Sequence, residues 1–441
     1  MQAGDLVKLF DEIGFVDTHE HIGVEDGICF DGRYTTRRTR TLWDVVFGAY
    51  IQNIFACAGE ADPPQLRYND DEEEIWQWLQ PRLPVIANMG TYRALMRGLR
   101  ELYDFPDGEI TTANWRDLSA QVKDQSEKVT RLEWYARGAA RAGIVRYLAF
   151  VDPNYYREYR SGLSDGDAAI ERRLVAPLAY VDVFLFLVGR IWPQDKQRDA
   201  LAELLDLPFA FTWEWVEEAI RRYLDFLVEE GSTRGVKFAC AYMRSLAFPA
   251  PDLQAMATGW PASAEDPDQA WVDNYQACVM HTVCRLAGDR GLPVIFHTGL
   301  GHADVTAGRP THLLPLIDAF PGTRFVILHA AFPYTGELIA IAARRANVVF
   351  DMSWSPLLSR ETFRGLFSQA IEHVQATKFL FGHDVSTAEH LVGTHRITIE
   401  TIAEVLAEKV RQGYYSPTLA ENLVRLFARE NPERLLGVQA D

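Results

Sequence analysis

The sequence is poor in the features that mark secreted and membrane-spanning proteins. Its 441 residues include only five cysteines, none in CxxC spacing, and this odd, low number argues against a disulfide scaffold and fits a reducing compartment. The apolar run at 180–192 is too short to cross a membrane and contains Asp182 and Arg190. The first residues lack the basic and apolar regions of a signal peptide. We therefore expect a cytoplasmic protein without a membrane segment.

The sequence also lacks an excess of basic residues. It has 44 lysines and arginines against 61 aspartates and glutamates, a formal net charge of −17, which repels nucleic acids and anionic membranes. The expected partner is a small-molecule substrate. The negative net charge does not exclude an anionic small substrate, because a local site can still be positive. A homo-oligomer is compatible with the sequence as well. The hydrophobic share of 48% is enough for a large core.

No internal repeat is present, but short apolar runs alternate with helix-like stretches. Alternation of this kind is typical of parallel strands linked by helices. We predict an α/β fold, a (β/α)₈ TIM barrel forming one domain over residues 1–441, with a large helical insertion at about 30–140 after the first strand. The eight expected strands lie within 15–21, 145–152, 174–183, 234–242, 291–299, 323–332, 346–354 and 377–385.

Polar side chains follow several of these strands, where active sites of such barrels lie. His19 and His21 end the first strand and share a face because side chains alternate, whereas Glu20 should point away. Imidazole and carboxylate together suit zinc, and also manganese or iron. The later members of this set are Lys237, His297, His329 and Asp384.

The segments "DTHEH", "VIFHTGLG", "FVILHAAFPY", "VVFDMSWSPL" and "FLFGHDVS" resemble the amidohydrolase superfamily. They are most similar to its amidohydrolase-related (amidohydrolase 2) group of TIM-barrel metal-dependent hydrolases. That group also includes decarboxylases and hydratases, and it borders the uronate isomerases. The resemblance covers most of 12–30 and 230–438, and the insertion adds nothing to it.

The resemblance implies a role for each strand-end residue. His19, His21 and His297 would be metal ligands, and Asp384 both a ligand and the catalytic base. His329 would bind a second metal or polarise the substrate. Lys237 matches only in part, as a ligand to a second metal if it is carboxylated. The implied cofactor is a divalent metal, zinc before manganese or iron, as one or two ions.

Three further residues are candidates for substrate binding. Arg244 could hold a carboxylate, with a structural salt bridge equally compatible. His302 lies in the loop after the fifth strand, where an exposed loop histidine is the simpler interpretation. Trp354 ends the seventh strand and could wall the pocket, although packing tryptophans are more common.

We expect a metal-dependent hydrolase in which activated water attacks a C–N amide or a lactone bond of a small polar substrate. The first alternative is a decarboxylase, hydratase or uronate-isomerase-like enzyme acting on a small carboxylic acid. A second alternative, a binding protein with a relic site, is disfavoured by the complete ligand set.

Overall fold

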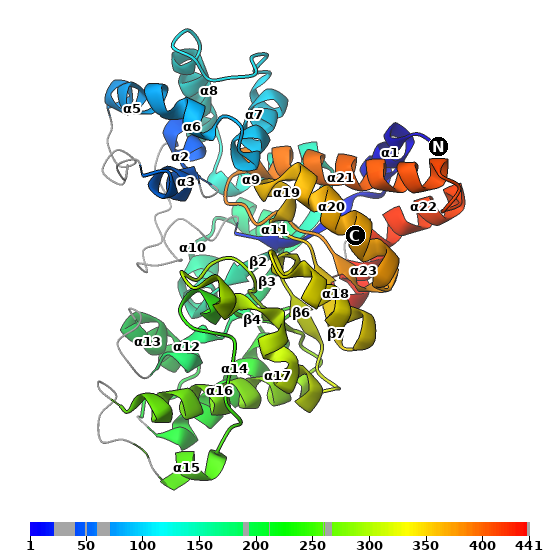
Figure 1. Ribbon diagram of the computed structural model, residues 1–441. Helices are drawn as coiled ribbons and strands as arrows, with labels where there is room; N and C mark the ends of the chain where they lie inside the picture. The colour runs from blue at the N-terminus through cyan, green and yellow to red at the C-terminus, as the bar shows by residue number, and fades with distance from the viewer. Residues whose placement is uncertain are drawn as a thin grey trace.

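The computed structural model describes residues 1–21, 40–48, 51–59, 71–187, 194–210, 212–258, 260 and 267–438. At its centre is an eight-stranded sheet in which every paired neighbour is parallel and the strands follow chain order (Figure 1). The predicted strand set is confirmed. The strands are β1 (Phe15–Glu20), β2 (Ile144–Val151), β3 (Val175–Tyr180), β4 (Val236–Phe238), β5 (Val294–Phe296), β6 (Phe325–Ile327), β7 (Val348–Asp351) and β8 (Phe379–Leu380).

Backbone hydrogen bonds between β1 and the segment that follows β8 bring the two edges of the sheet together. The Thr18 N–H donates to the Phe381 carbonyl at 3.1 Å, and the Asp384 N–H donates to the His19 carbonyl at 2.8 Å. These bonds link β1 to the segment after β8, so the sheet forms a nearly closed barrel. They also place the residues after β8 beside the end of β1.

The barrel interior is filled by apolar side chains that alternate along the strands. Val16, Leu148, Phe150 and Ile295 belong to this inner cluster, which is separate from the larger core between sheet and helices. Leu435 and two other C-terminal apolar residues, Leu436 and Val438, join the same cluster. Arg324, just before β6, donates to the Leu435 carbonyl at 2.6 Å, so the C-terminal segment closes the end of the barrel where strands begin. The opposite end of the barrel, where the strands end, is the end at which the candidate site residues lie.

Helices follow most strands and surround the sheet, as the alternating pattern predicts. The 24-residue helix α21 follows β8, and Thr387 caps it by accepting the His390 N–H at 3.2 Å. The helices outside the β1–β2 connection are α1 (Ala3–Ile13), α10 (Arg160–Gly162), α11 (Asp165–Leu174), α12 (Asp182–Leu185), α13 (Gln194–Leu204), α14 (Trp213–Glu229), α15 (Leu253–Thr258), α16 (Gln269–Asp289), α17 (Leu314–Ala319), α18 (Thr335–Arg344), α19 (Ser355–Leu358), α20 (Arg360–His373), α21 (Ala388–Arg411), α22 (Pro417–Arg425) and α23 (Asn431–Leu436).

Every secondary-structure element described between β1 and β2 is a helix, which confirms the predicted insertion. Its helices gather on one side of the barrel, beside α21 (Figure 1). They are α2 (Leu42–Val46), α3 (Ile51–Cys57), α5 (Glu72–Leu79), α6 (Leu83–Ile86), α7 (Gly90–Tyr103), α8 (Trp115–Lys128) and α9 (Arg131–Ala142).

Glycines let α7 and α21 approach until their backbones touch. A Cβ on Gly98 would lie 1.7 Å from the Glu389 carbonyl oxygen, and one on Gly393 would lie 1.8 Å from the Ala94 carbonyl oxygen. Any side chain at either position would force the helices apart. The insertion is therefore packed tightly onto the helix that follows the last strand.

A buried carboxylate fixes the same contact. The Glu389 side chain, at the start of α21, accepts hydrogen bonds from Arg40 at 3.0 Å, Tyr103 at 2.7 Å and Trp134 at 3.0 Å. All four residues are buried, and the three donors belong to the β1–β2 connection.

Within the described ranges, no helix is long and apolar enough to span a membrane.

Candidate metal centre

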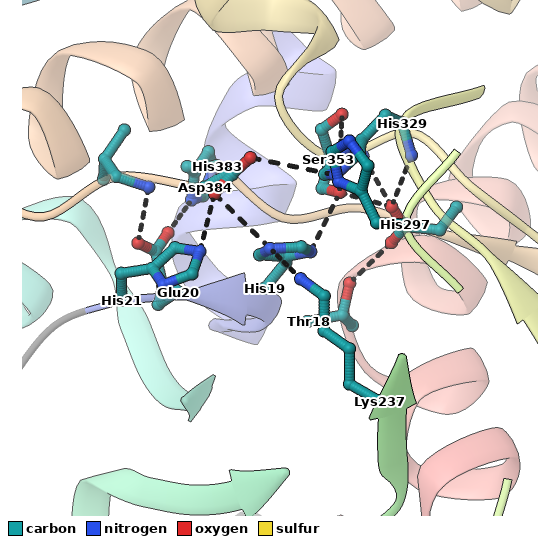
Figure 2. A network of polar contacts seen from close by, with 12 residues as sticks. Thr18, His19, Glu20, His21, Lys237, His297, His329, Ser353, His383 and Asp384 are labelled. Carbon is teal, nitrogen blue, oxygen red and sulfur yellow. Dashed lines mark hydrogen bonds and ion pairs between the residues drawn. The ribbon is translucent and has the colours of Figure 1, made fainter. Parts of the chain in front are cut away.

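The strand-end residues singled out by the sequence converge at one end of the barrel (Figure 2). His19 and His21 come from the end of β1, and Lys237 lies within β4. The remaining members follow later strands: His297 follows β5, His329 follows β6 and Asp384 follows β8. Apart from His21, which is partly exposed, these side chains are almost completely buried.

Two imidazoles face one carboxylate oxygen. The Asp384 Oδ1 atom lies 3.4 Å from His19 Nε2 and 3.0 Å from His21 Nε2. Among the described residues, none donates a hydrogen bond of good geometry to this buried oxygen. A buried carboxylate oxygen without a donor is costly unless a cation compensates it. The arrangement fits a divalent metal held by His19, His21 and Asp384.

A serine hydroxyl orients His19. Ser353 Oγ lies 3.3 Å from His19 Nδ1, and the hydroxyl donates its hydrogen to the Asp351 carboxylate. Because the hydroxyl hydrogen is committed, Ser353 can only accept from His19, so Nδ1 carries the proton and Nε2 presents its lone pair. This pairing between β1 and the segment after β7 has no local sequence signal.

Asp351 is itself held by groups around the site. Its carboxylate accepts the Ser353 N–H at 2.9 Å, the His329 N–H at 3.3 Å and the Thr18 hydroxyl at 3.2 Å. Burial raises the pKa of Asp351 to about 6, and these hydrogen bonds act in the opposite direction. Asp351 therefore ties the ends of β1, β6 and β7 together beneath the candidate ligands.

His297 and His329 form a pair next to this group. His329 Nε2 lies 3.0 Å from His297 Nδ1 and 3.9 Å from Asp384 Oδ2, while His297 Nε2 lies 2.7 Å from the Leu300 carbonyl oxygen. Ligand atoms of His19, His329 and Asp384 all lie within 4.8 Å of one another. His329 is thus a candidate ligand together with His19 and Asp384. The assignment of His297 as a ligand stays a prediction, because both its ring nitrogens contact protein atoms.

Burial keeps the imidazoles of His19 and His297 neutral. It lowers the pKa of His19 and of His297 to about 3, and the positive charge of Lys237 acts in the same direction. Burial alone would raise the pKa of Asp384, but the neighbouring imidazoles of His19 and His21 hold it well below its usual range. Neutral imidazoles and an ionised carboxylate are the forms in which these side chains bind metals.

Lys237 brings a positive charge to the same place. Its Nζ lies 3.5 Å from His19 Nε2 and 3.7 Å from the centre of the Phe150 ring, a cation–π distance. The Tyr180 ring centre is 5.7 Å away. The lysine thus reaches the site as the family pattern implies, and its carboxylation stays a prediction.

The three predicted substrate contacts are placed differently. Trp354 meets the His329 ring at a centroid distance of 5.4 Å and so lies at the site. Arg244 donates to Gln276 and to the Ser245 and Ala247 carbonyls, so its guanidinium is engaged in holding its own loop. His302 Nδ1 accepts the Asp304 N–H at 2.9 Å, also within its loop. The structure does not bring Arg244 and His302 into contact with the candidate ligands.

Two aromatic side chains at the site were not predicted. The centre of the Phe150 ring lies 4.4 Å from that of the His19 ring. The Tyr242 ring stacks on the His297 ring at a centroid distance of 4.1 Å and an interplanar angle of 30°, while 44% of Tyr242 stays exposed. Phe150 stands near the end of β2, which could have indicated its position. Tyr242 follows β4 within a short 3-10 turn, and no periodic pattern marks it.

Comparison with known families agrees with this geometry. The family model described as Amidohydrolase matches residues 193–438, more than half of the chain. The chain belongs to the amidohydrolase family. The match begins before β4 and includes the strands that supply Lys237, His297, His329 and Asp384.

Solved structures share the fold over nearly the whole chain. A glucuronate isomerase from Caulobacter crescentus is 14% identical with a TM-score of 0.76, covering 99% of this chain and 93% of that one. A uronate isomerase from Thermotoga maritima is 14% identical with a TM-score of 0.75, covering 98% and 97%. A Lactobacillus casei protein described as a metal-dependent hydrolase is 16% identical with a TM-score of 0.65, covering 98% and 97%. At these identities the likeness establishes the TIM-barrel fold.

A curated protein matches only a short part of the sequence. Protein fluG from Emericella nidulans is 35% identical over 95 residues, which is 21% of this chain and 11% of fluG. This chain therefore matches about a tenth of the length of fluG.

Proposed function

We propose that this protein is a metal-dependent hydrolase that cleaves a C–N amide or a lactone bond in a small polar substrate. The observation that carries the proposal is the convergence of His19 Nε2, His21 Nε2 and Asp384 Oδ1, with a carboxylate oxygen that lacks a donor among the described residues. His19, His21 and Asp384 would hold the metal, with His297 or His329 completing the set. Zinc is the favoured ion, since imidazole and carboxylate ligands suit it, and manganese or iron remain alternatives.

A divalent metal bound here would supply Lewis acidity and lower the pKa of water from 15.7 to about 7. The residues of the chain account for the proton and for positioning. Asp384 Oδ2, on the side of the carboxylate away from His21, would accept the proton of the attacking water. The new C–O bond forms as the C–N or lactone C–O bond breaks, and Asp384 returns the proton to the leaving nitrogen or oxygen. If His297 completes the ligand set, His329, whose Nε2 lies 3.9 Å from Asp384 Oδ2, would stabilise charge on the substrate carbonyl oxygen.

A second function is favoured by one feature. Lys237 places a buried cation beside the ligands, and such a cation suits a substrate carboxylate. A decarboxylase, hydratase or uronate-isomerase-like enzyme for small carboxylic acids would use it. The two isomerases reported above share the fold, and their names motivate including uronates among the test substrates.

The test is a parallel screen with the metal-reconstituted protein. Amides and lactones are assayed for hydrolysis, carboxylic acids for CO₂ release and uronates for isomerisation. The proposal expects turnover of an amide or lactone, abolished by Asp384→Asn. Turnover confined to carboxylic acids or uronates would replace it with the second function. We further propose a cytoplasmic location, which fractionation of the native cells would check.

A further inference from the structure

A second buried polar cluster lies behind the candidate metal centre. It consists of Asp17, Glu20 and His383, each with 0% exposure, and they come from β1 and from the segment after β8. Each stands next to a candidate ligand in sequence or two residues from one. The sequence interpretation assigned Glu20 only a direction away from the metal and gave the other two no role.

The three side chains join β1 to the segment that carries Asp384. His383 Nδ1 pairs with the Asp17 carboxylate and lies 3.3 Å from Glu20 Oε1. The free ends of the two carboxylates hold backbone groups: Asp17 Oδ1 accepts the His19 N–H at 3.1 Å, and Glu20 Oε2 accepts the Val385 N–H at 3.1 Å. The cluster therefore grips the backbone of one candidate ligand, His19, and that of the residue that follows another, Asp384.

The backbone between these contacts is unusual. Asp384 has φ +59°, in the left-handed region that non-glycine residues rarely adopt. Its N–H donates to the His19 carbonyl at 2.8 Å, and a Cβ on Gly382 would lie 2.6 Å from the His19 nitrogen. Side-chain contacts at 383 and a carboxylate contact at 385 thus flank a strained residue that presents the candidate ligand.

The geometry points to a positioning role: Asp17, Glu20 and His383 form a buried clamp that fixes the backbone of His19 and Asp384 so that their ligand atoms meet. This inference rests on the proposed metal function, because the clamp acts on its ligands. It assigns a purpose to the histidine of the "GHD" segment that the family resemblance does not supply. The clamp acts on the candidate ligands through the backbone N–H groups of His19 and Val385, so its members are positioning residues.

Amide substitutions at His383 separate positioning from bulk packing. The asparagine side-chain nitrogen is attached to Cγ, as Nδ1 is, whereas the glutamine nitrogen is one bond further out, as Nε2 is. His383→Asn thus keeps a donor toward Asp17, and His383→Gln moves it. Glu389→Gln is the matched control, since Glu389 is an equally buried, hydrogen-bonded carboxylate on α21 that contacts no candidate ligand.

The experiment measures the Zn²⁺ dissociation constant by competition with a chromophoric chelator, the zinc content per chain and the fraction folded. Loss of a group that orients metal ligands typically weakens affinity about 10–100-fold, and we expect this for His383→Ala. His383→Asn should restore most of the affinity and His383→Gln should not, a comparison that also decides the matter if His383→Ala fails to fold. Glu389→Gln should bind zinc like the parent protein.

The opposite results are equally distinct. If the parent protein binds zinc and His383→Ala binds it with the same affinity, the clamp is overturned and the proposed function stands. The same conclusion follows if Glu389→Gln loses as much zinc affinity as His383→Ala. The loss of a zinc ion per chain in His383→Ala, with the remaining affinity unchanged, shows instead that the cluster itself binds metal. A parent protein that binds no zinc overturns the proposed function and the clamp together.

Discussion

Replacing Glu389 by glutamine should strongly destabilise the attachment of the insertion to the barrel. The Glu389 and Arg40 side chains are 0% and 8% exposed and lie 3.0 Å apart, so the substitution leaves the guanidinium buried without its counter-charge. Removing one partner of a buried ion pair typically costs about 3–5 kcal/mol. The glutamine oxygen can still accept from Tyr103 and Trp134, so we expect the lower end, about 3 kcal/mol in the free energy of unfolding.

The assay is urea unfolding followed by circular dichroism at neutral pH. Replacing both partners, as in Arg40→Met with Glu389→Gln, should recover a large part of the loss, because no uncompensated charge remains. The pKa of Glu389 is held below its usual range against the effect of burial, chiefly by Arg40, so its stabilisation is present at neutral pH and is lost as pH falls through the folded pKa. The single variant should therefore approach the parent in stability on acidification. A loss well under about 1 kcal/mol, or a double variant no better than the single one, would refute the reasoning.

Three other perturbations test separate parts of the account. Ser353→Ala should weaken Zn²⁺ binding about 10–100-fold in chelator competition, since His19 loses the acceptor that fixes its Nδ1 proton, and unchanged affinity would remove that role. Burial lowers the pKa of His390 from 6.5 to about 4, so the parent should lose stability from this group as pH falls from 6.5 to 4. Over this pH range the free energy of unfolding of His390→Asn should fall by about 3 kcal/mol less than that of the parent protein, measured by denaturant unfolding at each pH. Parallel curves of unfolding free energy against pH for the two proteins would contradict the lowered pKa of His390. Lys237→Met should raise KM for an anionic substrate more than it lowers kcat if the ammonium binds a carboxylate, and the reverse result would place Lys237 in the chemical step.

The strand pattern and the strand-end residues were within reach of the sequence. Strands buried on both faces have continuous apolar runs, and their order places the polar residues that follow them at one end of a barrel. That reasoning located β1 to β8, the facing pair His19 and His21, and the helical insertion. The convergence of His329 and Asp384 on the same site followed from the same order.

Contacts between side chains far apart in the sequence could not be predicted, because no local periodicity in the sequence indicates them. Ser353 meets His19 across 334 positions of sequence, and His383 meets Asp17 across 366. The engagement of Arg244 by its own loop depends on the loop's conformation rather than on residue type. Periodicity predicts which face a side chain occupies, and packing decides which partner it finds there.

The central claim is that His19, His21 and Asp384 hold a divalent metal, and metal analysis of the purified protein tests it most directly. The account predicts about one or two transition-metal ions per chain, or their uptake by metal-depleted protein, and a marked loss of binding in His19→Ala and Asp384→Asn. A folded protein that contains no transition metal and takes up none on reconstitution would contradict it.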